Sequence, residues 1–453
     1  MPLTDSGIPS AAPPSDGTAP GTPLGTAAQV RGSLATYVIR VVLGAVMGVV
    51  ISRALEPAGR GEYSIIVIIA TITTVVGHLS IGNANVAFWS AHRSAIPGTN
   101  LILGPPLGAA AAVIVGLVVV ALGPGIVPIA HPWLLVVAMF TVPVAVSIVH
   151  LTMVMLLLGR VDIVNRSLTI ATILQCAALL ICNAAGLLSP ATVVWLWAIA
   201  GVLPLLLMLP TLRPHFRPPD LPLARRMIGV GAQYHVGLIA LYLLLRIDVL
   251  LLNALAPIAA VGLYTLAVTL GEMAYAGTDA LSQSLLRRQA ESQISAAGDL
   301  AARTTRVALI VALVSVGAIC AAAPVVVPML YGEAFRPSVP ALFALAPGIV
   351  AYGATRPLVA YLLRQDRPRL MSALSLGALV VNVTLNLVLI PSMGIVGCAL
   401  ASSAGYLALA TAQTIWFSRA ADVPLLALRP RWSDVSLIVA AARPVSALPA
   451  ARR

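Results

Sequence analysis

The chain consists almost entirely of long apolar stretches, and their length limits what it can fold into. A helix needs about 20 apolar residues to cross a bilayer, and twelve such stretches follow one another along the sequence. They lie near residues 33–53, 63–90, 101–129, 133–158, 167–187, 190–212, 227–253, 258–286, 306–330, 341–363, 370–391 and 395–418. Only 9% of the residues are charged, against about 25% in soluble domains. The sequence therefore predicts an all-α integral membrane protein with about twelve transmembrane helices.

Arginine residues are distributed unevenly between the loops on the two sides of this bundle. Loops after even-numbered stretches hold fourteen arginines, whereas loops after odd-numbered stretches hold only Arg53, Arg60 and Arg336. Cytoplasmic loops carry the excess of basic residues in membrane proteins. The pattern predicts a multi-pass plasma-membrane protein with the even-side loops and both termini in the cytoplasm. It also accounts for the net charge of +12 without a nucleic-acid partner.

Composition divides the chain into five parts. The first 30 residues are rich in Pro, Gly, Ser, Thr and Ala, a composition that does not support a packed core. The expected order is a disordered N-terminal tail (1–30), an N-terminal six-helix lobe (31–213), a basic cytoplasmic linker (214–226), a C-terminal six-helix lobe (227–418) and a cytoplasmic C-terminal tail (419–453).

Two short segments about 200 residues apart are nearly the same. ALEPAGRGEY covers residues 54–63, and ALAPIAAVGLY covers residues 254–264. Aligning Gly61 with Gly262 also matches Ser64 with Thr265. Repeats with an even number of spans are parallel and are related by an axis along the membrane normal. The match predicts two six-helix lobes related by a pseudo-two-fold repeat, with chance similarity between apolar stretches as the alternative.

Polar residues recur at helical spacing on the second stretch of each half. They are Thr265, Thr269, Glu272, Asp279 and Gln283 in one half, and Thr71, Thr74, His78 and Asn85 in the other. Ionisable groups at membrane depth are costly and usually functional. We expect Glu272 and Asp279 to line a cavity or couple transport to an ion, and His78 to bind substrate. Helix–helix hydrogen bonding is the alternative.

Four further charged residues interrupt the apolar stretches. Arg40 and Arg356 lie inside the first and tenth stretches, and Arg246 and Asp248 lie near the end of the seventh. Guanidinium groups bind phosphate or diphosphate through paired hydrogen bonds, so Arg40 and Arg356 are expected to bind substrate. Arg246 and Asp248 are expected to belong to the cavity or ion-coupling group, and an internal ion pair with Asp248 is the preferred interpretation of Arg246. An ion pair with Glu272 is the alternative for Arg40.

The sequence predicts neither a cofactor nor a metal site. None of the four cysteines forms a CxxC pair. An enzyme acting on lipid-linked sugars needs an extramembrane loop or domain with carboxylates or a metal. The external loops are short, and their only acids are Glu56, Glu62 and Glu333. An enzyme is therefore not expected.

Four segments taken together carry a family resemblance. They are SRALEPAGRGEYS, LRIDVLLLNALAPIAAVGLYTLA, LYGEAF and NVTLNLVLIPSMGIVGCALAS. In this order they resemble the polysaccharide-transport branch of the multidrug/oligosaccharidyl-lipid/polysaccharide exporter superfamily, which includes O-antigen flippases, over most of residues 30–418. Glu56 departs from the family pattern, which commonly has Gly before this proline.

The resemblance implies an alternating-access flippase with a central cavity between two lobes. It implies that a polyprenyl-diphosphate-linked oligosaccharide moves from the cytoplasmic to the external leaflet for cell-surface polysaccharide synthesis. The implied partners are this substrate, membrane lipid, a coupling cation (H⁺ or Na⁺), and a glycan polymerase with glycosyltransferases.

Three other functions compete with this interpretation. A multidrug or cation antiporter of the same superfamily would favour an acidic, aromatic-lined cavity, but only 5% of the residues are aromatic. Arg40 and Arg356 favour an anionic substrate instead. A membrane enzyme acting on lipid-linked sugars and a scaffold that binds partners through residues 419–453 are the remaining alternatives.

Overall fold

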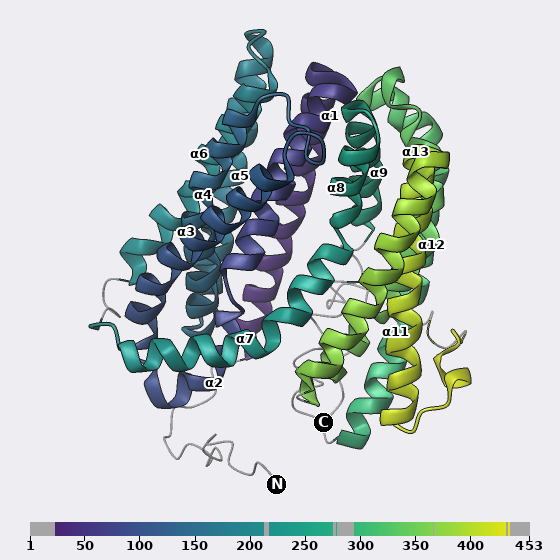
Figure 1. The fold of residues 1–453 in the computed structure, drawn as a ribbon. Helices are drawn as coiled ribbons and strands as arrows, with labels where there is room; N and C mark the ends of the chain where they lie inside the picture. The colour runs from purple at the N-terminus through teal and green to yellow at the C-terminus, as the bar shows by residue number, and fades with distance from the viewer. Residues whose placement is uncertain are drawn as a thin grey trace.

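A computed structural model describes residues 23–212, 217–274, 278, 294–365, 367–431 and 434 (Figure 1). Within these residues the long regular elements are all α-helices. They are α1 (Pro23–Gly77), α2 (Ile81–His92), α3 (Ile96–Leu122), α4 (Pro132–Leu157), α5 (Val161–Ala184), α6 (Pro190–Leu212), α7 (Leu221–Leu244), α8 (Ile247–Leu255), α9 (Ile258–Met273), α11 (Ile294–Val326), α12 (Ser338–Arg364) and α13 (Pro368–Ala420). Short π- and 3₁₀-segments (Val327–Tyr331, Glu333–Phe335) join α11 to α12, and a 3₁₀-turn (Leu425–Leu428) follows α13.

Twelve membrane spans can be traced through these helices. In the described ranges, nine helices are long and apolar enough to cross a bilayer. α1 and α13 each contain two spans, because the backbone kinks at Glu56 (φ 55°) and at Gly394 (φ 55°). The shorter apolar helix α9 lies where the remaining span is predicted. The prediction of an all-α membrane fold with twelve spans is confirmed.

The kink in α1 replaces the loop that the sequence predicts there. Glu56 adopts a left-handed conformation, which is unfavourable for a residue with a side chain, and Pro57 begins the next helix. Arg60, which we expected in an exposed loop, is only 6% exposed. Its guanidinium turns back across the kink and donates to the Gly48 carbonyl (3.2 Å) and to the Ser52 hydroxyl. These bonds satisfy polar groups near the end of the first span.

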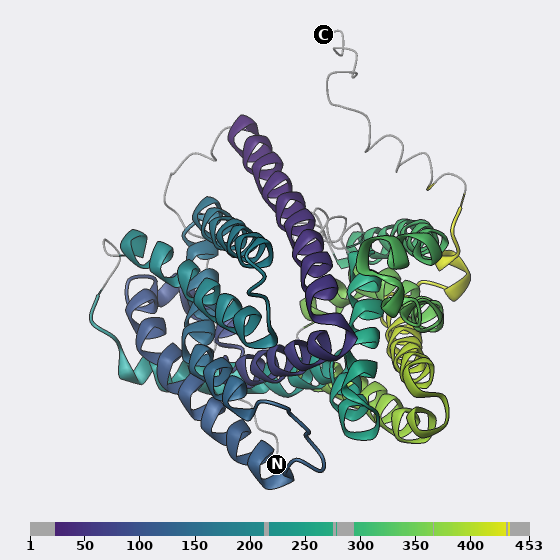
Figure 2. The same cartoon turned by 90° about the horizontal axis from the view of Figure 1, so that it is seen from above.

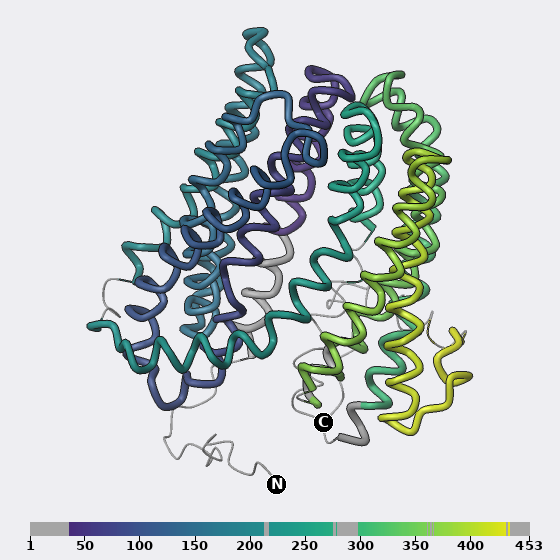
Figure 3. The backbone as a smooth tube through the Cα atoms, in the orientation of Figure 1, coloured from purple at the N-terminus to yellow at the C-terminus, as the bar shows by residue number. Residues whose placement is uncertain are grey.

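Three helix boundaries differ from the predicted stretches. Breaks at residues 78–80 and 245–246 separate α1 from α2 and α7 from α8. Hydropathy does not register them, because the flanking residues remain apolar. α11 begins at Ile294 rather than near residue 306, so Arg303 and Arg306 lie in a helix and not in a loop. The backbone through the α7–α8 break can be followed in Figure 3.

The helices form two groups, as the predicted two-lobe layout requires. α1 to α6 pack mainly with one another, and α8 to α13 form the second group (Figure 2). α7 runs from one group to the other at the lower end in Figure 1, where it contacts α2, α3 and α13. The largest apolar core includes residues of both groups, from Ile65 on α1 to Leu409 on α13. We call this lower end the α7 end and the opposite one the Glu56 end.

The two sequence repeats meet each other at the Glu56 end. A Cβ placed on Gly61 would lie 2.2 Å from the Ile258 carbonyl oxygen, and one placed on Gly262 would lie 1.9 Å from the Pro57 carbonyl oxygen. Close by, the hydroxyls of Ser64 and Thr265 lie 3.2 Å apart. Each of these contacts joins residues that the repeat alignment equates, or near neighbours of them. Equivalent residues meet in this way only beside a two-fold axis, so the pseudo-two-fold axis passes between these helices.

The chain after α13 is fixed to α11 by one arginine. Arg306 Nε donates to Asp434 Oδ2 (2.8 Å), and its Nη1 donates to the Ala427 carbonyl (2.9 Å). The Arg431 N–H also donates to Asp434 (2.9 Å). Burial raises the pKa of Asp434, but these hydrogen bonds outweigh burial and hold the pKa below its ordinary value of 3.8. The carboxylate form is therefore the one that binds.

The hydrogen bonds between Arg306 and Asp434 predict how the chain after α13 responds to acid. The pKa of Asp434 is lower in the folded protein than its ordinary value of 3.8. The stabilisation of the folded segment by Asp434 is therefore complete above pH 3.8, and it is lost as the pH falls through the lower pKa of the folded protein. Amide hydrogen exchange of residues 423–431 is expected to stay slow from neutral pH down to that value and to accelerate below it, after correction for intrinsic exchange rates. Asp434→Asn is expected to exchange rapidly already at neutral pH. Slow exchange in this variant would show that Asp434 does not anchor the segment.

Candidate functional site

The break between α7 and α8 brings two charged groups to the start of α8. Arg246 caps the helix with a non-helical backbone (φ −138°, ψ −17°), and Asp248 lies in its first turn. The Asp248 carboxylate accepts the Val249 N–H at 2.8 Å, which satisfies a backbone donor at the helix start. Residues two apart in a helix do not face each other. Arg246 and Asp248 therefore point to different surroundings and do not form the pair that we considered.

Arg246 pairs with Glu272 on α9 instead. Arg246 Nη2 lies 2.8 Å from Glu272 Oε1, and the two side chains are 24% and 38% exposed. Tyr242 lies beside the pair and is hydrogen-bonded to Arg246 and to Thr71, which is the residue that the repeat alignment equates with Glu272. Residues of both lobes therefore surround this ion pair. A partly exposed guanidinium held by an exchangeable carboxylate can accept another anion.

We expect this pair to be energetically coupled. In a double-mutant cycle of Arg246→Gln and Glu272→Gln, the coupling free energy should lie toward the lower end of the range of about 0.5–3 kcal/mol for contacting residues, because both groups are partly exposed. Thermal unfolding of the four proteins measures it. The Arg336–Glu333 pair, 71% and 74% exposed, is the matched control and should show coupling near zero. Strictly additive effects at Arg246 and Glu272 would contradict the pairing.

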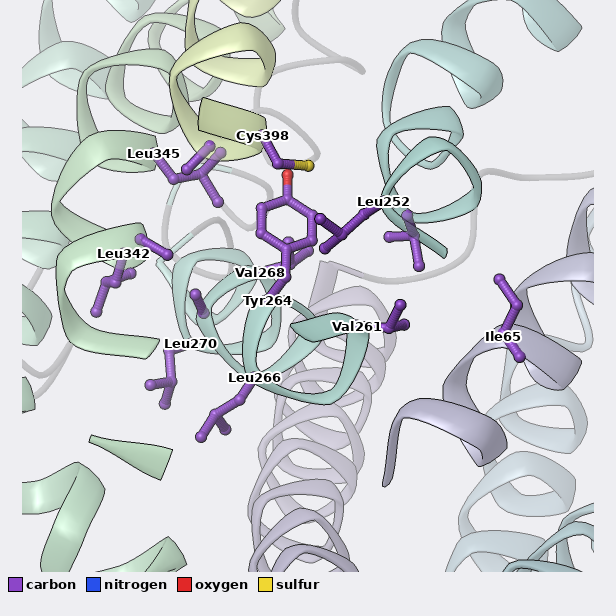
Figure 4. Close-up of a cluster of buried hydrophobic side chains, with 14 of the residues drawn as sticks. Ile65, Leu252, Val261, Tyr264, Leu266, Val268, Leu270, Leu342, Leu345 and Cys398 are labelled. Atoms are coloured by element: carbon purple, nitrogen blue, oxygen red, sulfur yellow. The ribbon is translucent and has the colours of Figure 1, made fainter. Parts of the chain in front are cut away.

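Asp248 lies in a buried polar cluster inside the second lobe. Its side chain has no exposed surface, and its carboxylate accepts hydrogen bonds from the hydroxyls of Tyr264 and Ser402, the latter at 2.6 Å. The Tyr264 ring lies among apolar side chains with its hydroxyl next to Cys398 (Figure 4). No basic side chain of the described residues lies within 4 Å of Asp248. Three hydrogen bonds and the charge of the more distant Arg246 act on this carboxylate, and a bound proton or cation would neutralise it.

Two asparagines extend this cluster along α13. The Asn382 amide donates to Ser402 Oγ (3.3 Å), and the Asn386 amide donates to the Asn382 carbonyl (2.9 Å). Both side chains are fully buried. Among the residues that the structure describes, the side-chain oxygen of Asn386 has no hydrogen-bond partner, although such oxygens are normally paired when buried. A carboxylate, hydroxyls and amide oxygens are the ligands that hard cations prefer.

The remaining predicted site residues take no part in the Arg246–Glu272 ion pair. Arg40 lies partly exposed on α1 and takes part in none of the ion pairs between described residues. The Arg356 guanidinium lies over the Tyr352 ring, 5.0 Å from its centroid, a cation–π contact. Asp279 lies outside the described residues. The structure therefore brings Arg246, Asp248 and Glu272 to one region. The Tyr352 ring under Arg356 in turn packs against the Tyr406 ring (centroids 5.7 Å apart), which lies near Arg246.

His78 belongs to a group of histidines at the α1–α2 break. Leu79 and Ser80 are left-handed (φ 45° and 50°), and the Ser80 N–H donates to His78 Nδ1 (3.1 Å). His150 Nε2 donates to the His78 carbonyl (3.0 Å), and the His78 and His235 rings meet edge to face at 5.5 Å. The histidines thus satisfy backbone groups that the break leaves unpaired.

His235 connects this break to α7. Its Nε2 donates to the Val76 carbonyl (3.0 Å), and its Nδ1 lies 3.1 Å from the Ser80 hydroxyl. Nearby, a Cβ on Gly231 would lie 2.3 Å from the Leu79 carbonyl oxygen, so the α7 backbone itself touches the break. The lobes are therefore joined at the α7 end by these contacts of His235 and Gly231, and at the Glu56 end by Gly61 and Gly262.

Sequence reasoning missed the partners of Asp248. Ser402 comes from a helix remote in sequence, and no local pattern marks it. Tyr264 ends the repeated segment ALAPIAAVGLY, but the repeat was used only to match the two lobes. Asn382 and Asn386 did give a signal, since amides four residues apart in an apolar stretch share a helix face. We used that segment only for its family resemblance.

Comparisons with known proteins agree with this architecture. No family model matches the chain, and no curated protein matches it significantly. Among solved structures, it matches the lipid II flippase MurJ in an inward closed conformation, with a TM-score of 0.68 and 14% identity over 87% of this chain and 88% of that one. It matches an inward-facing multidrug resistance MATE family transporter of the MOP superfamily, with a TM-score of 0.62 and 14% identity over 86% and 95%. A mutant of the Vibrio cholerae MATE transporter VcmN gives a TM-score of 0.62 and 13% identity over 90% and 99%. At this identity the likeness concerns the fold, which is the one that the sequence resemblance implied.

Proposed function

We propose that this chain, which has the fold of MOP-superfamily transporters, is an alternating-access flippase. Its substrate would be a polyprenyl-diphosphate-linked oligosaccharide, moved from the cytoplasmic to the external leaflet for cell-surface polysaccharide synthesis. The two termini would lie in the cytoplasm. A polymerase and glycosyltransferases that handle the same glycolipid are the expected functional partners.

The observation that carries this proposal is the placement of Arg246 and Asp248 on one helix break. Arg246 is held by Glu272, which a phosphate oxygen of the substrate can replace. Asp248, two residues later, lies in an oxygen-lined cluster suited to H⁺ or Na⁺. Because Arg246 caps α8 and Asp248 lies in its first turn, a movement of α8 on cation binding at Asp248 would also move Arg246. The break thereby couples the ion to the anionic substrate.

The lobe contacts suit alternating access. The α7 end is joined by His235 and the Glu56 end by Gly61 and Gly262. Rocking one lobe against the other would open one end while the other stays closed. Arg40, Arg356 and His78 are proposed to contact the substrate during this cycle, and Asp279 to assist coupling. Each cation that crosses the membrane can contribute about 2.3 kcal/mol per 100 mV.

A multidrug or cation antiporter is the second candidate. The 38% exposed carboxylate of Glu272 could bind an organic cation, and MATE transporters share this fold. In that case Arg246 would pair with Glu272 until the organic cation replaces Arg246 on this carboxylate. The two candidates predict opposite charges on the substrate.

Deleting the gene tests the proposal. The expected result is accumulation of complete lipid-linked oligosaccharide on the cytoplasmic leaflet, measured with a membrane-impermeant glycan reagent on oriented vesicles. The wild-type gene should restore the leaflet distribution, and Glu272→Gln and Arg40→Ala should not. Arg336→Ala, an exposed position, is the control and should restore it. An unchanged glycolipid distribution together with new sensitivity to cationic drugs would favour the antiporter.

A further inference from the structure

We infer that a groove between α3 and α4 holds the hydrocarbon tail of the transported lipid. This inference rests on the proposed function and adds a second binding site to it. The groove has a volume of about 680 Å³, within the range of about 300–1,000 Å³ for ligand pockets. It lies in the half of the first lobe nearer the Glu56 end.

The groove follows from how the two helices cross. A Cβ on Gly104 would lie 2.8 Å from Ser147 Cα, and one on Gly108 would lie 2.6 Å from Pro143 Cα, so the backbones touch there. Beyond this crossing the helices separate toward the 123–131 loop. A Cβ on Gly116, in the middle of the groove, would meet nothing within 4 Å. The glycines thus fix a contact at one end of the pair and leave a gap at the other.

The lining excludes a polar occupant. None of its residues carries a charged, hydroxyl or amide side chain; they are Ala109, Ala112, Val113, Gly116, Val119, Val120, Gly123, Pro124, Val127, Ile129, Pro132, Leu135, Val136, Met139, Phe140 and Pro143. Val120 and Phe140 are 78% and 79% exposed. Of the nine apolar helices in the described ranges, α3 also has the smallest buried share. The groove therefore opens toward the bilayer, and a hydrocarbon chain is the chemical class that fits it.

The end of the groove at the 123–131 loop explains why the hydrocarbon chain would be the tail of the substrate. The 123–131 loop is bound to both lobes. His131 Nδ1 lies 2.6 Å from Glu62 Oε1 on α1, and the Asn253 amide on α8 donates to the Pro128 carbonyl (3.0 Å). Val127 and Ile129 line the groove and pack against the apolar core shared by the lobes. A hydrocarbon tail in the groove therefore reaches the lobe interface, next to α8, which Arg246 caps and which carries Asp248.

Photocrosslinking tests the inference. The full-length protein in nanodiscs would be irradiated with a polyprenyl diphosphate that carries a diazirine in its tail, and separately with a phospholipid that carries a diazirine in its acyl chain. We expect the polyprenyl probe, but not the phospholipid, to label residues 109–143 preferentially. Gly116→Phe should reduce this labelling at least fivefold because the ring fills the groove. Gly317→Phe, at another glycine with nothing within 4 Å of its Cβ, is the matched control and should leave it unchanged.

Binding of a soluble, short-chain sugar diphosphate, measured in parallel, separates the two proposals. Retained head-group binding with tail labelling spread over other helices would overturn the groove and leave the flippase standing. Equal labelling by both probes would also overturn it, because the groove would then hold bulk lipid only. Absence of both head-group binding and polyprenyl labelling would overturn the flippase and the groove with it.

Discussion

Replacing Gly262 by alanine is expected to abolish transport and to lower the melting temperature of the protein. The added Cβ would lie 1.9 Å from the Pro57 carbonyl oxygen and 3.0 Å from the Gly61 nitrogen. Both are backbone atoms, so no side chain can turn aside, and the two lobes must move apart at the Glu56 end. Overpacking of this kind typically costs about 1–3 kcal/mol of folding free energy. Thermal unfolding and transport in proteoliposomes measure the two effects.

A matched variant separates this contact from a general effect of changing a helical glycine. Gly317→Ala adds the same atom where nothing lies within 4 Å, so it should keep full transport and unchanged or slightly higher stability. Gly61→Ala should behave like Gly262→Ala, because it opens the same interface. The double variant should lose less than the sum of the single losses, since one contact cannot be lost twice. Normal transport by Gly262→Ala would contradict a closed contact between the repeats.

Changing Asp248 to asparagine is expected to remove ion coupling while the protein still folds. Asparagine keeps the shape and one oxygen for the hydroxyls of Tyr264 and Ser402, but it cannot take up a proton or hold a cation by charge. Transport should fall at least tenfold and lose its dependence on an H⁺ or Na⁺ gradient. Asp248→Ala should in addition unfold at lower temperature, because each buried hydroxyl left without an acceptor costs about 1–3 kcal/mol.

The control for this prediction is Glu333→Gln, which neutralises a 74% exposed carboxylate. It should change neither the transport rate nor its dependence on the ion gradient. Gradient-dependent transport by Asp248→Asn at the wild-type rate would remove Asp248 from the coupling mechanism. A comparison of H⁺ and Na⁺ gradients in the wild-type protein would identify the ion.

The fold was predictable because the membrane constrains it strongly. The length of the apolar stretches follows from bilayer thickness, and the match of Gly61 with Gly262 predicts two lobes related by a two-fold axis. The contact between those glycines was not predictable, since alignment shows that positions are equivalent and not that they touch. The breaks beside His78 and Arg246 were missed because the surrounding residues are as apolar as those of an unbroken helix.

The candidate site was predictable only in part, for a related reason. Charged residues in apolar stretches identified Arg246, Asp248 and Glu272, because such residues are costly anywhere in a membrane. Their partners depend on which helices pack together, and the sequence left several pairings open. Glu272 pairs with Arg246 rather than with Arg40, a choice made by the packing of α8 beside α9.

The most direct test of the account is reconstitution of the purified protein with a labelled polyprenyl-diphosphate oligosaccharide in liposomes. The glycan is protected from an external glycosidase until it crosses the bilayer. The account predicts that wild-type protein exposes it faster when an ion gradient is applied, and that Asp248→Asn and Gly262→Ala do not. Gradient-driven uptake of an organic cation, with the glycan remaining protected, would contradict the flippase and assign the protein to cation export.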